Sequence, residues 1–106
     1  LLPSLEASAT PLGLQMRLAR QRRGWTLVEM AARAVISVST CKRIESGDPS
    51  VALGSWLSVL SQLQLLDPVV AASAPEADRL GQAYRDLRRP QRVRSGALIK
   101  DDRYDF

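Results

Sequence analysis

Histidine is absent from this 106-residue sequence, and cysteine occurs once. Without histidine, neither a His-based catalytic triad nor a histidine-containing zinc site can be assembled. A single cysteine excludes a disulfide framework and is typical of a reducing cytoplasm. Catalysis by Asp, Glu and Lys alone stays open, but no acidic pair stands out from the background. We therefore expect no enzyme, no catalytic residues, no metal and no cofactor.

Long apolar stretches and aromatic side chains are scarce as well. No apolar run reaches the roughly 18 residues of a membrane-spanning helix, and no signal-peptide pattern opens the chain. Aromatic residues make up 5% of the chain, against 45% for all hydrophobic residues. A chain of this length and composition can form one small domain with tails, and we expect it in the cytoplasm.

Arginine, by contrast, is plentiful and unevenly distributed, and the net charge is +4. One group lies before the centre of the chain and consists of Arg17, Arg20, Arg22 and Arg23. A second group lies near the C-terminus and consists of Arg85, Arg88, Arg89, Arg92 and Arg94. Clustered positive charge suits a polyanionic partner, although charge alone is weak evidence for one.

The most informative segment is residues 24–47, with the sequence GWTLVEMAARAVISVSTCKRIESG, which predicts two short helices joined by a tight turn. Thr26 and Ser37 are favourable N-caps for the two helices, and Gly47 ends the second one with a left-handed residue. The positions expected to face inward are Met30, Ala31, Ala34, Cys41 and Ile44. Such a pair cannot form a core alone, but it can hold one helix outward, as a helix-turn-helix DNA-binding unit requires.

The flanking segments predict further helices. Residues 1–10 show no periodicity and are predicted to be a flexible arm. A helix is expected over 11–23, with Pro11 near its start, and another over about 52–64. The apolar stripe of the latter consists of Leu53, Trp56, Leu57, Leu60 and Leu63 or Gln64. A helical turn then precedes a last helix that begins at Pro75, with a stripe of Leu80, Tyr84 and Leu87. No strand pattern appears, so the predicted fold is all-α.

The chain from about residue 12 to 66 resembles the Cro/CI-type (XRE) helix-turn-helix family. The resemblance is carried by LGLQMRLARQRRGWT, TLVEMAARA, ISVSTCKRIESGDP and LGSWLSVLSQLQLLD, in the family's order and spacing. It implies a five-helix DNA-binding domain over 11–66, a helical extension over 67–90 and a basic, then acidic, tail over 91–106. It also implies a two-fold dimer on a palindromic operator. Candidate interface residues are Leu66, Val69, Val70, Leu80 and Tyr84, with plain core packing as the alternative for the first three.

In this family the third helix enters the major groove of double-stranded DNA by its N-terminal end. The side chains facing away from the core, and therefore expected to contact bases, are Val38, Ser39, Lys42 and Arg43. A guanidinium can pair with both O6 and N7 of guanine, so Arg43 is expected to carry most of the base discrimination, about 1–3 kcal/mol.

Candidate phosphate contacts are Thr26, Thr40, Ser46, Arg17, Arg22 and Arg23. The hydroxyls lie near helix ends, where they can bind phosphate or cap the helix, and for Thr26 capping is favoured. The arginines are equally well explained as ordinary exposed residues. The resemblance further implies that Arg20 on the first helix and Glu45 at the end of the third form a structural ion pair.

Two residues depart from the family pattern. Leu27 stands at the start of the second helix, where the family often has a glutamine that contacts a phosphate. Val35 occupies the turn, where a residue tolerant of a left-handed backbone is usual and where valine is costly. One phosphate contact is therefore expected to be missing, and the turn is expected to differ slightly from the family mean.

The segment LLDPVVAASAPEADRLGQAYRDLRRPQRVR is similar to the tail of HipB-like antitoxins. That resemblance implies a repressor of its own operon that binds a HipA-like serine/threonine kinase toxin near the bacterial nucleoid. Candidate partner or phosphate contacts are Arg88, Arg89, Arg92 and Arg94. A free-standing or phage-type XRE regulator without a toxin remains the alternative, and a protein-interaction module without DNA binding is a second one.

Overall fold

The computed structural model describes residues 4–88, and these residues form helices with no strand. The elements are α1 (Leu5–Arg22), α2 (Leu27–Ala34), α3 (Val38–Glu45), α4 (Leu53–Gln62), α5 (Leu66–Ala71), a 3₁₀ turn η1 (Pro75–Ala77) and α6 (Arg79–Arg88). The predicted all-α class is confirmed for this part of the chain. None of its helices is long and apolar enough to cross a membrane. The chain divides into two units, one ending at Ala72 and the other beginning at Ser73.

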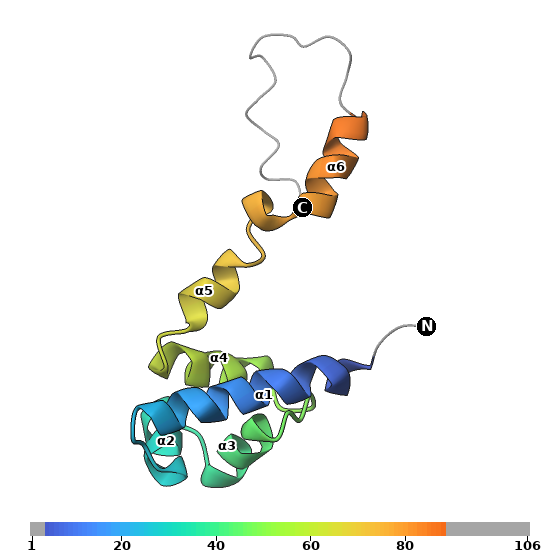
Figure 1. Ribbon diagram of the computed structural model, residues 1–106. Helices are drawn as coiled ribbons and strands as arrows, with labels where there is room; N and C mark the ends of the chain where they lie inside the picture. The colour runs from blue at the N-terminus through green and yellow to red at the C-terminus, as the bar shows by residue number, and fades with distance from the viewer. Residues whose placement is uncertain (1–3, 89–106) are drawn as a thin grey trace. The chain divides into compact units, whose positions relative to one another are not determined.

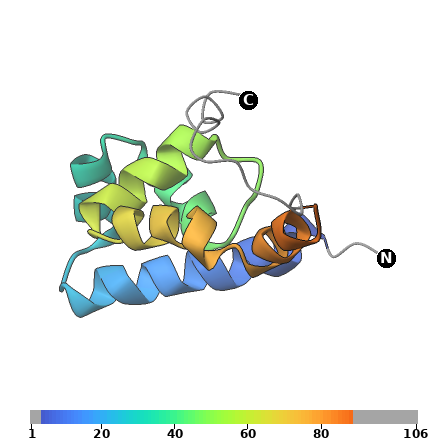
Figure 2. The same cartoon turned by 90° about the horizontal axis from the view of Figure 1, so that it is seen from above.

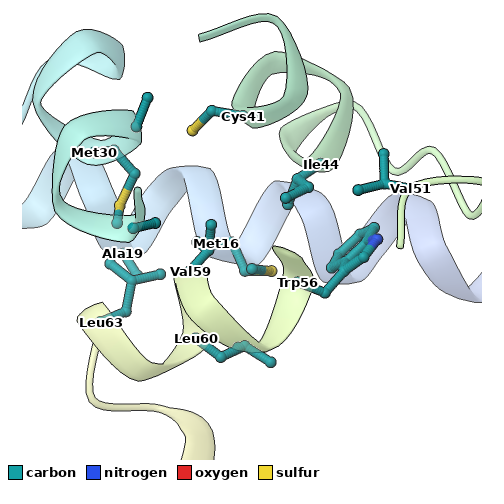
Figure 3. Packing of buried hydrophobic residues seen from close by; sticks show 12 residues of the cluster. Met16, Ala19, Met30, Cys41, Ile44, Val51, Trp56, Val59, Leu60 and Leu63 are labelled. Atoms are coloured by element: carbon teal, nitrogen blue, oxygen red, sulfur yellow. The ribbon is translucent and has the colours of Figure 1, made fainter. Parts of the chain in front are cut away.

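The first unit is built around one hydrophobic core. Helices α2 and α3 lie next to each other, with α1 packed on α3 and α4 packed on α2 (Figures 1 and 2). Side chains from all four helices meet in the centre, as Figure 3 shows for Met16, Met30, Ile44 and Trp56. All five predicted inward positions of α2 and α3 are buried. The core therefore fixes how α3 is held.

The stripe predicted for α4 is only partly correct. Trp56, Leu60 and Leu63 are buried, but Leu53 is 69% exposed. The buried Val51, two residues before the helix, lies in the core at this end. The helix also ends at Gln62 rather than at 64, because Gln64 adopts a left-handed backbone with φ of 60°.

The prediction of a flexible arm over residues 1–10 is wrong from Leu5 onward, because α1 begins at Leu5. Ser4 is its N-cap, and the Ser4 hydroxyl oxygen accepts a hydrogen bond of 3.2 Å from the Ala7 amide. Pro11 lies inside the helix rather than at its start. The added turns pack on the end of α3, where the backbones of Thr10 and Gly47 are so close that no side chain fits at Gly47.

The second unit contains η1 and α6 and has no buried residue among those described. The single helix predicted from Pro75 is interrupted at Asp78, whose backbone is non-helical, with φ of −89° and ψ of 80°. An Asp78 carboxylate oxygen instead accepts a hydrogen bond of 2.8 Å from the Gly81 amide and so caps α6. Leu80, Tyr84 and Leu87 are exposed along this helix.

Candidate nucleic-acid interface

Helix α2 starts with two reciprocal hydrogen bonds. The Thr26 hydroxyl oxygen accepts one of 3.0 Å from the Glu29 amide, and the Glu29 carboxylate accepts one of 2.7 Å from the Thr26 amide. The hydrogen bond from the Thr26 backbone is the main cause that lowers the pKa of Glu29. The cap was predicted from the sequence but the role of Glu29 was not, although Thr-x-x-Glu is a known signature of this capping box.

The turn between α2 and α3 adopts the left-handed geometry despite its valine. Val35 has φ of 57° and ψ of 48°, and its side chain is 88% exposed. The next residue, Ile36, packs against the core and donates a hydrogen bond of 3.0 Å to the Ala31 carbonyl. The backbone bonds and the packing of Ile36 hold Val35 in a conformation that costs a β-branched residue energy.

Helix α3 has one buried face and one exposed face. The Ser37 hydroxyl oxygen accepts a hydrogen bond of 3.0 Å from the Thr40 amide and so caps the helix. Cys41 and Ile44 point into the core, as Figure 3 shows, and burial raises the pKa of the Cys41 thiol to about 11. The side chains predicted to contact bases are all exposed, namely Val38, Ser39, Lys42 and Arg43.

Arg43, which was expected to carry most of the base discrimination, is held by two residues that follow the helix. Its Nε donates a hydrogen bond of 2.9 Å to the Asp48 carboxylate, and its Nη2 donates one of 2.8 Å to the Ser50 hydroxyl. Neither contact was predicted from the sequence. The spacing from Arg43 through the helix-ending Gly47 to Asp48 is the signal that could have suggested it.

Arg20 and Glu45 form an ion pair between α1 and α3. Arg20 donates two hydrogen bonds to the carboxylate, of 2.7 Å from Nε and 3.0 Å from Nη2, and both side chains are largely buried. A third bond of 2.8 Å runs from Nη1 to the Trp25 carbonyl. The hydrogen bonding to Glu45 raises the pKa of Arg20. The pair fixes α3 relative to α1 and to the segment before α2.

A hollow of about 300 Å³ lies beside this ion pair. Its walls are Arg17, Arg20, Leu27, Lys42, Glu45 and Ser46. Arg20 and Glu45 neutralise each other, so Arg17 and Lys42 give the hollow its positive charge. Leu27 forms the wall where the family often has glutamine. Arg17 from α1 and Lys42 from α3 therefore lie close to Leu27, the position at which the family often has a glutamine.

Several other predicted phosphate residues already have partners within the fold. Arg23 donates hydrogen bonds of 2.8 Å to the carbonyls of Ala19 and Leu63, and so caps the C-terminal end of α4. The Thr40 hydroxyl oxygen accepts one of 2.9 Å from the Ser37 hydroxyl, and the Ser46 hydroxyl donates one of 2.9 Å to a backbone carbonyl. Arg17 and Arg22 are exposed.

The residues predicted for a dimer interface lie in different environments. Leu66 is half-buried against the core, as the packing alternative predicted, whereas Val69 is 41% and Val70 60% exposed. Val69 lines an apolar groove of about 360 Å³ together with residues of α1 and α4, among them Trp56. Leu80 and Tyr84 are exposed in the second unit, as is Arg88. Arg89, Arg92 and Arg94, and the tail predicted over 91–106, lie outside the described residues.

Comparison with known proteins gives two matches. A family model described as a helix-turn-helix domain matches residues 11–85. Antitoxin HipB of Escherichia coli O6:H1 is 32% identical over 72 residues, which cover 66% of this chain and 77% of that protein. No solved structure matches the chain. The family match extends from Pro11 in α1 to Arg85 in α6.

Proposed function

The chain belongs to the helix-turn-helix family of the Cro/CI (XRE) type, and on this premise we propose that it is a sequence-specific DNA-binding repressor. One observation carries the proposal. Helix α3 is anchored by the buried Cys41 and Ile44, while its opposite face exposes a row of side chains free of the core. An α-helix held in this way fits the major groove of B-DNA.

Each exposed side chain of α3 can make a distinct base contact. Arg43 can donate two hydrogen bonds to guanine, and the Val38 side chain suits a thymine methyl group. Ser39 can donate or accept, so it discriminates less. Lys42 lies both on this face and in the wall of the positive hollow, so it can contact a base or a phosphate.

Phosphate contacts position the protein on the duplex without selecting a sequence. The exposed Arg17 and Lys42 on the walls of the hollow support a phosphate site there, which would serve in place of the glutamine that other family members have at the position of Leu27. Arg22, Thr26, Thr40 and Ser46 remain further candidates. Arg23 is the weakest candidate, because capping α4 already engages two nitrogens of its guanidinium.

A single α3 contacts too few base pairs for useful specificity. We therefore propose a two-fold dimer that binds half-sites about 34–36 Å apart on one face of a palindromic operator. The exposed Val69 and the groove that it lines are the proposed contact surface in the first unit, and Leu80 and Tyr84 are the proposed contacts in the second.

The finer proposal is that this repressor is the antitoxin of a type II pair. It would repress its own operon in the bacterial cytoplasm and bind a HipA-like serine/threonine kinase toxin. The matched relative named Antitoxin HipB supports this role. The candidates for the toxin contact are Arg88, which is exposed, and Arg89, Arg92 and Arg94, which lie outside the described residues. Co-purification with the product of an adjacent kinase-like gene tests it. If the two proteins do not co-purify, the alternative of a regulator without a toxin is favoured.

DNA binding itself is tested by a salt titration on the promoter of its own operon. If about six phosphates are neutralised, the logarithm of the binding constant falls with the logarithm of salt concentration at a slope of about −5. Arg43→Ala should lose discrimination between sites. Arg79→Ala, an exposed arginine on α6, is the matched control and should keep it. Equal weak binding to every duplex would contradict the proposal and favour the protein-interaction module.

A further inference from the structure

Asp48 and Ser50 form a small hydrogen-bonded network with Arg43 at the C-terminal end of α3. One Asp48 oxygen accepts the 2.9 Å bond from Nε of Arg43, and the Ser50 hydroxyl oxygen accepts the 2.8 Å bond from Nη2. The other Asp48 oxygen accepts bonds from Ser50, of 2.9 Å from its amide and 2.7 Å from its hydroxyl. The three side chains therefore close a hydrogen-bonded ring on one edge of the guanidinium.

The backbone places Asp48 next to Arg43. Gly47 has φ of 83°, its amide donates a hydrogen bond of 2.9 Å to the Ile44 carbonyl, and the Asp48 amide donates one of 3.0 Å to the Arg43 carbonyl. These two bonds are the Schellman motif, which turns the chain back over the last turn of a helix. The contact between Asp48 and Arg43 thus follows from how α3 ends, and not only from a choice of side-chain rotamer.

The network uses one edge of the guanidinium and leaves another exposed. A guanidinium has five N–H donors in one plane. Asp48 and Ser50 take the edge formed by Nε and Nη2, and within residues 4–88 no hydrogen bond occupies Nη1 of Arg43. The edge formed by Nη1 and Nη2 can still donate two parallel bonds, which is the geometry that pairs with O6 and N7 of guanine.

We propose that Asp48 and Ser50 are positioning residues that hold Arg43 in the orientation in which it contacts guanine. This inference rests on the proposed DNA-binding function. A flexible arginine that is ordered before binding loses less conformational freedom on binding, so the base contact becomes more favourable. Hydrogen bonds from Ser50 lower the pKa of Asp48 to about 2, so the carboxylate is ionised at neutral pH.

The negative charge of Asp48 has a second consequence for selectivity. A carboxylate bonded to Arg43, just after the C-terminal end of α3, repels phosphates of any sequence, which weakens non-specific binding. At the cognate site the oriented Arg43 offsets this repulsion through its guanine contact. Asp48 therefore increases the ratio of specific to non-specific affinity in two ways. It strengthens the guanine contact of Arg43, and it weakens binding to other sequences.

The test uses the full chain and an operator duplex selected from a random pool. Dissociation constants are measured at one salt concentration for the operator and for duplexes in which each base pair is replaced in turn. Asp48→Asn should lose about tenfold in discrimination at a single guanine, the one at which Arg43→Ala also loses it. Ser50→Ala should lose less at the same position. Affinity of Asp48→Asn for random duplex should rise.

Two controls separate positioning from a general effect of charge or fold. Asp67→Asn removes the same charge from an exposed site on α5 and should leave every base preference unchanged. The double variant Asp48→Asn with Arg43→Ala should discriminate no worse than Arg43→Ala alone, because Asp48 acts through Arg43.

The outcomes distinguish this inference from the function on which it rests. Unchanged or improved discrimination in Asp48→Asn, with the wild type still selective, overturns the positioning role alone. A loss of discrimination that is spread evenly over all base pairs also overturns the positioning role, because such a loss would indicate a general structural role of Asp48. A wild type that selects no duplex overturns the proposed function itself.

Discussion

The region from α1 to α4 and the region from η1 to α6 carry similar sequence patterns but reach different structures. Both contain apolar residues at helical spacing, such as Trp56 and Leu60 in α4 and Leu80 and Tyr84 in α6. In the first region these side chains are buried, whereas in the second none is. A ten-residue helix without tertiary packing is marginally stable in water. Periodicity therefore indicates which face of a helix is apolar, but not what covers that face.

The largest expected effect comes from breaking the ion pair that fixes α3. Arg20→Ala leaves the largely buried Glu45 without its cation, and should lower the free energy of unfolding by about 3–5 kcal/mol. Urea unfolding followed by tryptophan fluorescence measures it, since Trp56 lies in the core of this unit. Arg22→Ala, an exposed arginine on the same helix, should change stability by less than about 0.5 kcal/mol. Equal losses in the two variants would contradict the structural role of the pair.

Truncating one apolar side chain in each region tests the comparison directly. Met30→Ala creates a cavity at a side chain that is 0% exposed, and should cost about 2–5 kcal/mol. Leu80→Ala removes a side chain that is 65% exposed, and should cost less than about 0.5 kcal/mol in a dilute sample. The measurement is again urea unfolding.

Repeating the Leu80→Ala measurement at high protein concentration sharpens the result. A loss that grows with concentration would show that α6 becomes buried between subunits, as proposed for the dimer. A large loss that is independent of concentration would show instead that α6 packs within one chain, and the contrast between the two regions would fail.

Relieving the turn of the first region should stabilise it. Val35→Gly removes a β-branched side chain from a left-handed conformation without removing core packing, since this side chain is 88% exposed. The expected gain is about 1 kcal/mol in unfolding free energy. Val28→Gly makes the same deletion at an exposed position inside α2, where it should instead cost about 1 kcal/mol. A loss in both variants would argue against strain at Val35.

The smallest expected effect is a loss of stability in acid. The folded-state pKa values of Glu29 and Asp48 are both lowered, that of Asp48 to about 2. Their contribution is therefore fully present above the unfolded pKa values, near pH 4, and disappears as pH falls through the folded values. Unfolding free energy should decline between about pH 4 and pH 2.

A variant assigns part of that decline to one residue. Asp48→Asn cannot titrate at this position, so its stability should fall less steeply over the same pH range. An identical slope in the variant and the wild type would mean that the Asp48 contacts contribute nothing to stability in the folded protein.

The local features of this protein follow from residues that are close together in the chain. Thr26, Ser37 and Gly47 act on backbone groups within a few residues of themselves, so their effect is the same wherever the segment lies. The inward positions of α2 and α3 followed for the same reason, because one face of a short helix is set by residue spacing. These features were sufficient to predict the outward face of α3.

The partner of each long side chain, by contrast, depends on how the helices pack. Proline is favoured in the first turn of a helix and disfavoured in its interior, yet α1 continues back to Leu5, where its added turns pack on the end of α3, so that Pro11 lies inside it. No partner within the fold was predicted from the sequence for Arg23 or Arg43. In the structure Arg23 caps α4, and Arg43 donates hydrogen bonds to Asp48 and Ser50. A long cationic side chain has several acceptors within reach, and the folded geometry determines which of them it meets.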